Sequence, residues 1–310
     1  MLRTCFTARL MWNTDCEIEI ISSGAGKERT LRRFSLCHKC DTIYLSSFYF
    51  AKRSEGAGES FPCWGLGQSP KYKTKRGNDM RYDVLLCDAD NTLFDFNKAE
   101  ENAFAIACEQ MGFSSTPELL ATYSKINEAL WKLLEQGGIT QEVLRVRRFE
   151  QFLEAIHRND DAQKMCDAFV DALGRQSVPL DGAVEAVKRW SAKVPVIIVT
   201  NGIGQVQRGR MAGSELRPYV SGLVISEEDG AAKPNPLMLE KGMELAHVTD
   251  RRRALMLGDS LTSDMAAARN AGIDACWFNP KGAANDKGVP IAYEIASLDE
   301  VDAILDGTEE

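Results

Sequence analysis

The chain has 310 residues, of which 44% are hydrophobic and 26% are charged, and its formal net charge is −8. This length allows two domains, or one domain with an appendage. The acidic balance argues against binding to nucleic acid or to a membrane surface, because either partner attracts a basic face. No apolar run approaches the roughly eighteen residues of a membrane span. The nine irregularly spaced cysteines favour a reducing, cytoplasmic setting over a disulfide framework.

Residues 1–79 differ in composition from the rest of the chain. They carry a net charge of +5, against −13 for residues 80–310, and they show no sustained helical or alternating pattern. Their one candidate motif, Cys37-His38-Lys39-Cys40, offers a single ligand pair. A structural zinc site normally combines two such pairs, so a zinc site is the weaker hypothesis. Because Met80 directly precedes the first expected strand, we expect residues 1–79 to be an extension, either disordered or upstream of the real start.

The first expected strand ends in two carboxylates. The apolar run Val84–Cys87 is typical of a buried strand in a parallel sheet, and Asp88 and Asp90 follow it. The chemistry of open α/β sheets lies just outside the carboxyl ends of the strands. Residues i and i+2 of an extended segment point the same way. We therefore predict that both acids face one pocket; a plain polar turn is the alternative.

Four amphipathic helices with short connections are predicted within residues 97–175, as in a small helical bundle. Their expected N-terminal residues are Asn97, Thr116, Thr140 and Asp161. Because this segment follows the first motif directly, we expect it to form a cap over that motif. We also expect Trp131 and the other aromatic residues of the segment to lie in the core of the bundle rather than to contact a ligand.

Strands and helices alternate in the remainder of the chain, which indicates βαβ units and a parallel sheet. The expected strands cover residues 194–199, 220–226, 254–258 and, as the last one, 274–278. The predicted fold class is therefore α/β, with a Rossmann-like parallel sheet core formed by residues 80–96 and 176–310. The four-helix cap, residues 97–175, is inserted into this core.

Polar side chains follow four of the predicted strands. These side chains are Asp88 with Asp90, Thr200 with Asn201, Lys233, and Asp259 with Asp264. Each group by itself is commonly a turn, a solvated loop or a helix cap. Their occurrence in this order along one parallel sheet favours a single functional site.

This set of side chains suits the transfer of a phosphoryl group to water. An aspartate can attack phosphorus, and Asp88 is the predicted nucleophile. Asp90 would protonate the leaving oxygen and later deprotonate the attacking water. Because two carboxylates repel a phosphate dianion, the site also needs positive charge, and Lys233 supplies part of it.

Phosphate and metal ligands can be assigned within the same set. The predicted phosphate-binding groups are Thr200, Asn201, the Gly202 amide and Lys233. The predicted cofactor is Mg²⁺, which prefers hard oxygen ligands. Its predicted ligands are Asp88, Asp90, Asp259 and Asp264. For Asp264 the sequence leaves two roles open, because it could either coordinate the metal or hold Lys233 in place.

With these motifs, residues 82 to about 305 resemble the haloacid dehalogenase (HAD) superfamily of phosphohydrolases. The resemblance is matched at Asp88, Asp90, Thr200, Lys233, Asp259 and Asp264. The chain is more narrowly similar to the noncanonical pyrimidine nucleotidase family of 5′-nucleotidases. That similarity is carried by Asp88-Ala-Asp-Asn-Thr-Leu-Phe-Asp-Phe, Ile126-Asn-Glu-Ala-Leu-Trp…Arg147-Arg-Phe and Gly258-Asp-Ser-Leu-Thr-Ser-Asp…Asn270-Ala-Gly…Cys276-Trp-Phe-Asn-Pro. Residues 1–79 have no counterpart in the resemblance.

The resemblance implies a Mg²⁺-dependent phosphatase of a small phosphorylated metabolite, with a nucleoside 5′-monophosphate as the expected substrate. A phosphatase of another small metabolite, such as a sugar phosphate, is an alternative because the cap would decide specificity. A dehalogenase is less favoured, since that chemistry has no use for an acid at Asp90. A non-catalytic module that binds a phosphorylated ligand is the alternative of another class, and such a module has little reason to keep the full set of acids with Lys233.

Overall fold

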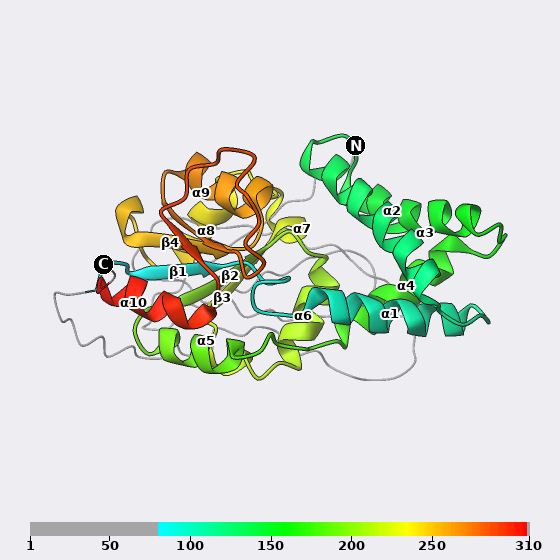
Figure 1. The fold of residues 1–310 in the computed structure, drawn as a ribbon, viewed down its shortest axis with the longest axis horizontal. Coiled ribbons are helices and arrows are strands. Elements are labelled where there is room, and N and C mark those ends of the chain that lie inside the picture. The colour runs from blue at the N-terminus through cyan, green and yellow to red at the C-terminus, as the bar shows by residue number, and fades with distance from the viewer. Residues whose placement is uncertain (1–79, 309–310) are drawn as a thin grey trace, which may run out of the picture. The chain divides into compact units, whose positions relative to one another are not determined.

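The computed structural model of the protein describes residues 80–308. Within these residues, six strands form one parallel sheet in the order β3-β2-β1-β4-β5-β6 (Figure 1). The strands are β1 (Val84–Cys87), β2 (Val196–Thr200), β3 (Gly222–Ile225), β4 (Ala254–Gly258), β5 (Asp274–Phe278) and β6 (Tyr293–Ile295). Helices cover the sheet, so the predicted α/β class with a Rossmann-like parallel sheet is confirmed.

The register of the three central strands brings their carboxyl ends together. Cys87, the last residue of β1, is level with Ile198 of β2 and with Leu257 of β4. The chain runs from β1 outward through β2 to β3, and then crosses to β4 on the other side of β1. Ligands of such sheets bind at the point where the strand order reverses. The topology therefore places the expected site at the ends of β1 and β4.

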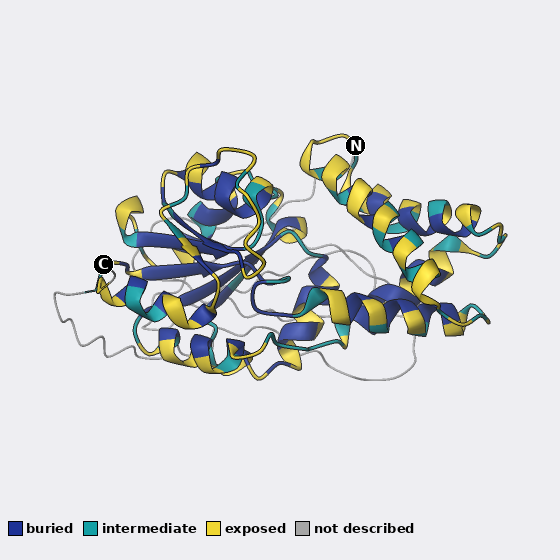
Figure 2. Cartoon of the chain, in the orientation of Figure 1, coloured by how far each residue is buried: buried dark blue, intermediate teal, exposed yellow. Residues whose placement is uncertain are grey.

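Both faces of the sheet are covered by helices, and β1 alternates between them. Leu85 and Cys87 face a cluster that includes α5 (Ala183–Ser191) and α10 (Val301–Asp306). Val84 and Leu86 face α8 (Leu237–Leu245) and α9 (Ala266–Ala271) on the opposite side. Figure 1 shows these two helical layers, and Figure 2 shows that the strands between them are buried. Because both faces are covered, β1 is apolar throughout.

The segment between β1 and α5 forms four helices with a hydrophobic cluster of their own. They are α1 (Phe96–Gln110), α2 (Pro117–Glu135), α3 (Gln141–Ala155) and α4 (Ala162–Gly174). Four stacked or edge-on aromatic rings fill the centre of this cluster. These rings belong to Phe104, Tyr123, Phe149 and Phe152. The cluster also takes in Ile203 and Val206 of the segment that begins α6 (Gly204–Ala212), so it is continuous with the sheet side of the chain.

Three of the four predicted helix starts are confirmed. The side-chain oxygens of Thr116, Thr140 and Asp161 accept hydrogen bonds from backbone N–H groups of the first turns that follow them. The predicted start at Asn97 is wrong. Asp95 caps α1 by accepting from the Lys98 N–H at 2.9 Å, so the helix begins two residues earlier than predicted.

Several short elements were not predicted. The strand expected to be the last one, β5, is followed by β6 and α10. A π-helical turn, η3 (Leu261–Met265), precedes α9, where the sequence predicts only a loop into a helix. A one-turn helix, α7 (Ser226–Asp229), follows β3. Such short elements leave little periodic signal in a sequence, because one turn or three strand residues do not repeat a pattern.

The four cysteines of the described part, Cys87, Cys108, Cys166 and Cys276, are free and buried, as predicted for small core residues. The predictions for residues 1–79, including the extension and the Cys37–Cys40 motif, lie outside the described residues. Among residues 80–308, none of the helices combines the length and the apolar character that crossing a membrane requires.

Candidate active site

The predicted site residues gather around one cavity. A cavity of about 270 Å³ opens at the carboxyl ends of β1, β2 and β4. All of the predicted catalytic, phosphate-binding and metal-binding residues line it: Asp88, Asp90, Thr200, Asn201, Gly202, Lys233, Asp259 and Asp264. The strand ends that lie far apart in the sequence therefore meet, because parallel strands end at the same edge of the sheet.

Lys233 is the cation at the centre of this cavity. Its side chain is only 1% exposed, and its Nζ lies 2.5 Å from Asp88 Oδ1 and 2.7 Å from Asp264 Oδ1. It also donates to the Val199 carbonyl oxygen at 2.7 Å. Burial alone would lower the pKa of Lys233, but the charges of Asp264 and Asp88 outweigh it and raise this pKa. Lys233 is therefore a fully partnered ammonium ion.

Three carboxylates surround this one ammonium, which leaves the cavity with surplus negative charge. Oxygens of Asp88, Asp259 and Asp264 lie within 4.8 Å of one another. Burial raises the pKa of Asp88, and Lys233 opposes this rise. Burial, followed by the charge of Asp264, raises the pKa of Asp259 to about 7. A divalent cation would relieve this repulsion, and clustered carboxylate oxygens are the donors that Mg²⁺ prefers. The residues present thus fit a magnesium site.

The structure separates the predicted metal ligands. Both oxygens of Asp264 are engaged, Oδ1 by Lys233 and Oδ2 by the Ser260 N–H at 3.1 Å. Of the two roles that the sequence left open for Asp264, this geometry favours holding Lys233 in place. By contrast, the contact of Asp259 Oδ1 with the Thr92 hydroxyl is long, at 3.5 Å. Among the three clustered acids, Asp88 and Asp259 are the better placed to take a metal.

The Asp90 side chain lies outside the carboxylate cluster, and its predicted place among the metal ligands stays a prediction. One of its oxygens is paired with Arg210 Nη1, and the other accepts from Gln207 Nε2 at 2.7 Å. Arg210 is fully buried, stacks on Phe94 with its guanidinium carbon 4.6 Å from the ring centre, and also donates to the Gln176 carbonyl oxygen. The guanidinium therefore holds the Asp90 side chain away from the other acids.

Arg210 and Gln207 were not found from the sequence. They lie three residues apart on α6, and such a spacing puts two side chains on one face of a helix. The sequence did contain a signal for them, because two polar residues three positions apart come shortly after the predicted strand end Thr200-Asn201-Gly202. The sequence could not show that this face is buried against Asp90.

The predicted phosphate-binding residues are placed at the cavity, but their side chains already have partners. Asn201 donates to the Lys233 carbonyl oxygen at 2.8 Å and accepts from the Lys233 N–H at 2.7 Å. Its side chain therefore positions the Lys233 backbone, and its predicted contact with phosphate stays a prediction. The Gly202 N–H donates to Thr200 Oγ1 at 3.0 Å, which leaves the Thr200 hydroxyl hydrogen to donate to a ligand.

The helices α1, α2 and α3 supply the other wall of the cavity. Phe96, Trp131, Glu135 and Arg148 line it together with the strand-end residues. The prediction for Trp131 is therefore wrong, because this ring is only partly buried and faces the cavity. The prediction for the other aromatic residues is right for Tyr123 and Phe152, which are buried in the core of the four helices.

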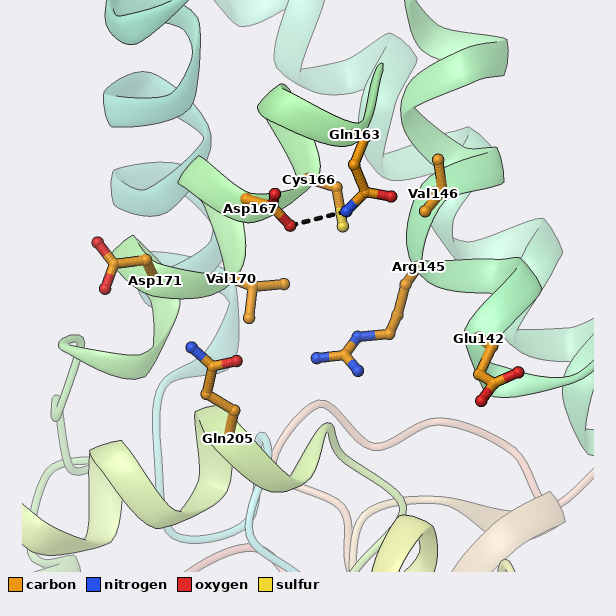
Figure 3. Close-up of a pocket in the computed structure, with 9 residues that line it drawn as sticks. All are labelled: Glu142, Arg145, Val146, Gln163, Cys166, Asp167, Val170, Asp171 and Gln205. Carbon is orange, nitrogen blue, oxygen red and sulfur yellow. Dashed lines mark hydrogen bonds between the residues drawn. The ribbon is translucent and has the colours of Figure 1, made fainter. Parts of the chain in front are cut away.

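Polar contacts join the helical segment to the loops that follow the strands. Thr262 donates to Glu135 Oε2 at 3.2 Å, and Gln141 donates to the Asn201 carbonyl oxygen at 3.3 Å. Arg145 forms an ion pair with Glu227 at 3.0 Å. A separate cavity of about 560 Å³ lies beside Arg145, whose guanidinium points between α3, α4 and Gln205 of α6 (Figure 3). The predicted site residues line the other cavity, so this second one is apart from the chemistry.

A family model described as haloacid dehalogenase-like hydrolase matches residues 82–272. The chain belongs to the haloacid dehalogenase-like hydrolase family. This confirms the resemblance inferred from the motifs, and it identifies the chain as a hydrolase.

Within this family, the chain is similar to two curated relatives and to one solved structure. The pyrimidine 5′-nucleotidase YjjG of Escherichia coli K12 is 34% identical, covering 73% of this chain and 99% of the relative. The pyrimidine 5′-nucleotidase PynA of Streptococcus pneumoniae R6 is 33% identical, covering 73% of this chain and 96% of the relative. The structure of the putative HAD-hydrolase YfnB of Bacillus subtilis, bound to magnesium, is 31% identical, with a TM-score of 0.69, and covers 73% of this chain and 99% of that one.

Proposed function

We propose that this protein is a Mg²⁺-dependent phosphomonoester hydrolase that works through an aspartyl-phosphate intermediate on Asp88. One observation carries the proposal: Asp88 directly follows β1 at the point where the strand order reverses, and its carboxylate lies 2.5 Å from Lys233 Nζ. The neighbouring Asp259 completes a donor set for a divalent cation. A nucleophilic carboxylate with positive charge beside it is what attack on a phosphate dianion requires.

In the proposed first step, an oxygen of Asp88 attacks phosphorus, and the bond from phosphorus to the ester oxygen breaks. Lys233 and the Thr200 hydroxyl would stabilise the charge on the phosphoryl oxygens. When bound, Mg²⁺ would be held by Asp88 and Asp259 and would supply charge stabilisation to the phosphoryl group. Asp264 would act indirectly, by keeping Lys233 in position.

Asp90 is the proposed proton donor and acceptor. It would protonate the leaving oxygen in the first step, and in the second it would accept a proton from the water that attacks the phosphoryl group and releases Asp88. Its carboxylate is held by Arg210 and Gln207. To reach the substrate, Asp90 must exchange these contacts for one with the leaving oxygen, and we include this exchange in the proposal.

For the substrate we propose a nucleoside 5′-monophosphate, and for residues 97–175 the role of a cap that closes the cavity. Two of the relatives bear the name pyrimidine 5′-nucleotidase. Trp131 and Phe96 offer aromatic and apolar surface in the cavity, which suits a planar ring better than a sugar alone. The four cysteines of the described residues are free and buried, which supports a cytoplasmic location for the enzyme.

The test is the release of inorganic phosphate from p-nitrophenyl phosphate, UMP, AMP and ribose 5-phosphate, with Mg²⁺ and with excess EDTA. We expect EDTA to abolish turnover and Asp88→Asn to lower kcat by at least about 1,000-fold, because the amide is a poor nucleophile. The exposed variant Asp286→Asn is the matched control and keeps wild-type rates. Activity that survives Asp88→Asn or EDTA refutes the mechanism, and a preference for ribose 5-phosphate over UMP refutes the substrate class.

A further inference from the structure

Arg210 of α6 is a fully buried cation whose ion-pair partner is an acid of the cavity. Its side chain is 0% exposed, and its Nη1 is paired with Asp90 Oδ1. Among the ion pairs of residues 80–308, this is the one that Arg210 forms. A buried charge needs a partner, and the loss of either member of such a pair leaves the other charge uncompensated. Each of the two side chains therefore constrains the position of the other.

Contacts outside the ion pair fix the guanidinium of Arg210. Its Nε donates to the Gln176 carbonyl oxygen at 3.1 Å, and its guanidinium carbon lies 4.6 Å from the ring centre of Phe94. Gln176 follows α4 and Phe94 precedes α1, so both connections between the helical segment and the sheet hold this group. A guanidinium that is stacked on a ring and hydrogen-bonded at its edge has little freedom to turn. Arg210 is therefore the fixed member of the pair, and Asp90 is the side chain that it positions.

Gln207, three residues before Arg210 on α6, holds the other oxygen of Asp90. Its side chain is buried, and its Nε2 donates to Asp90 Oδ2 at 2.7 Å. The amide lies directly against Gly202, where an added Cβ atom would be only 2.2 Å from Gln207 Nε2. A side chain at position 202 would therefore displace the amide from Asp90. One face of α6 thus engages both carboxylate oxygens of Asp90.

Without these contacts, Asp90 would be free to turn toward the other acids. It lines the same cavity as Asp88 and Asp259, and its side chain is 24% exposed. Burial is the largest cause of the raised pKa values of Asp88 and Asp259, and the negative charge of Asp90 adds to both rises. The Asp90 carboxylate is thus within electrostatic reach of the two residues that fit a divalent cation. A free carboxylate is a ligand that Mg²⁺ prefers.

We propose that Arg210 is a positioning residue that keeps the Asp90 carboxylate off the divalent cation and reserves it for proton transfer. The inference rests on the proposed function, in which Asp90 is the proton carrier and Asp88 and Asp259 hold Mg²⁺. The sequence predicts both roles for Asp90, metal ligand and proton carrier, and both use the same two oxygens. An oxygen that coordinates a metal is not free to contact the leaving oxygen or the attacking water. The pair with Arg210 therefore keeps Asp90 near the cation without making it a ligand.

A contribution to stability alone does not explain the buried pair. Ile203 and Val206 of the same segment pack into the apolar cluster of the helical segment, and Met211 packs into the cluster beside the sheet. Apolar residues would therefore suit the position of Arg210. Replacing a buried ion pair by apolar residues is often neutral or stabilising, because both charges lose their hydration on burial. A role in placing Asp90 accounts for a charged residue in these surroundings.

The first measurement is the dissociation constant of Mg²⁺ without substrate, by isothermal titration calorimetry on the full chain. Arg210→Met is expected to lower this constant about 3- to 30-fold, because the released Asp90 adds a carboxylate to the ligand set. The double variant Arg210→Met/Asp90→Asn lacks this ligand, and its constant should lie within about twofold of that of Asp90→Asn. Arg208→Met, which removes an exposed arginine of α6 that pairs with Glu228, is the matched control and should bind Mg²⁺ as the wild type does.

The second measurement is the turnover of UMP and of p-nitrophenyl phosphate at saturating Mg²⁺. Arg210→Met is expected to lower kcat for both at least about 10-fold, because both substrates share the step in which Asp90 accepts a proton from water. KM should change less than about threefold, since Arg210 does not touch the substrate. Arg210→Lys keeps a cation beside Asp90 and should lie between the wild type and Arg210→Met in both measurements. If Arg210→Met does not fold, Gln207→Leu releases the other oxygen of Asp90 and should shift both quantities in the same direction by a smaller factor.

An unchanged or weaker affinity for Mg²⁺ in Arg210→Met overturns the inference alone, and a merely structural role of Arg210 would give that result. A gain in affinity that the double variant keeps, or that disappears in about 1 M KCl, arises from charge without coordination and also overturns it. Full activity of Asp90→Asn, or hydrolysis that survives EDTA, instead overturns the proposed function on which the inference rests.

Discussion

Lys233 and Arg148 are buried cations that line one cavity from two regions of the molecule. Lys233, at the strand ends, has three acceptors for its ammonium, two of which are carboxylates. Arg148, from the helical segment, donates to a carbonyl and an amide oxygen. Burial raises the pKa of the nearby Glu100 carboxyl, and the charge of Arg148 is among the influences that oppose this rise. The strand ends keep surplus negative charge around Lys233, whereas the guanidinium of Arg148 is held by hydrogen bonds to neutral groups. The strand ends are therefore the region that needs a divalent cation, and the buried charge of the helical segment is held within the fold.

Replacing each of the two cations by methionine tests this difference most directly. Lys233→Met leaves Asp88 and Asp264 without their counter-ion and is expected to lower the free energy of unfolding by about 3–5 kcal/mol at neutral pH. Arg148→Met removes hydrogen bonds to two neutral groups together with a positive charge near the buried Glu100, and is expected to lower it by about 1–3 kcal/mol. Urea unfolding of both variants, with the exposed Lys188→Met as control, measures the difference. Equal losses would show that the two cations are equivalent in the fold.

A second comparison lies within the helical segment, between an aromatic residue of its core and an aromatic residue at the cavity. Phe152 lies in the core of the four helices, so Phe152→Ala is expected to lower the free energy of unfolding by about 3–5 kcal/mol. Trp131 is partly exposed at the cavity, and Trp131→Ala is expected to lower it by less than about 1 kcal/mol. The KM for UMP should nevertheless rise in Trp131→Ala. A large loss of stability in Trp131→Ala would show that Trp131 belongs to the core of the helical segment.

The effects of Mg²⁺ and of pH on stability test the strand-end region alone. Because the pKa of Asp259 is raised from 3.8 to about 7, the metal-free folded state keeps a proton that the unfolded state releases. The stability linked to this proton is complete below about pH 4 and is lost as the pH rises through about 7. Mg²⁺ binds the deprotonated form, so its stabilising effect should grow over the same interval.

Thermal unfolding with and without Mg²⁺ measures this effect. The gain in Tm on adding Mg²⁺ is expected to be larger by about 2–4 °C at about pH 8 than at about pH 5. Asp259→Asn should remove most of this pH dependence, whereas Arg148→Met should preserve it. A gain that is independent of pH in the wild type would contradict the assignment of Asp259 to the metal.

Much of the strand-end region could be predicted, because its signals are local. Each polar group stands next to a short apolar run, as Asp88 follows Val84–Cys87 and Asp259 follows the run that ends at Gly258. In a parallel sheet the carboxyl ends of neighbouring strands share an edge, so residues that follow different strands meet. This rule was sufficient to bring eight residues to one cavity without knowledge of their contacts.

The partners of those residues could not be predicted in the same way. Asp90 belongs to the predicted set, but its pairing with Arg210 depends on how α6 is rotated against β1. The sequence predicts a phosphate contact for the amide of Asn201, but it does not predict the two hydrogen bonds of this amide with the Lys233 backbone. Both outcomes depend on side-chain orientation across elements that are more than 30 residues apart, which periodicity does not encode.

The sequence by itself determined the parallel α/β class, the order of its main elements and the set of polar groups at the strand ends. It did so because buried strands, helix caps and strand-end acids each have a local pattern. The tertiary structure decided which of these groups are partnered, that Trp131 faces the cavity and that Arg148 joins it from α3. Burial and orientation arise only when distant helices pack, and they distinguish Lys233, which lies between carboxylates, from Arg148, which donates to neutral oxygens of the helical segment.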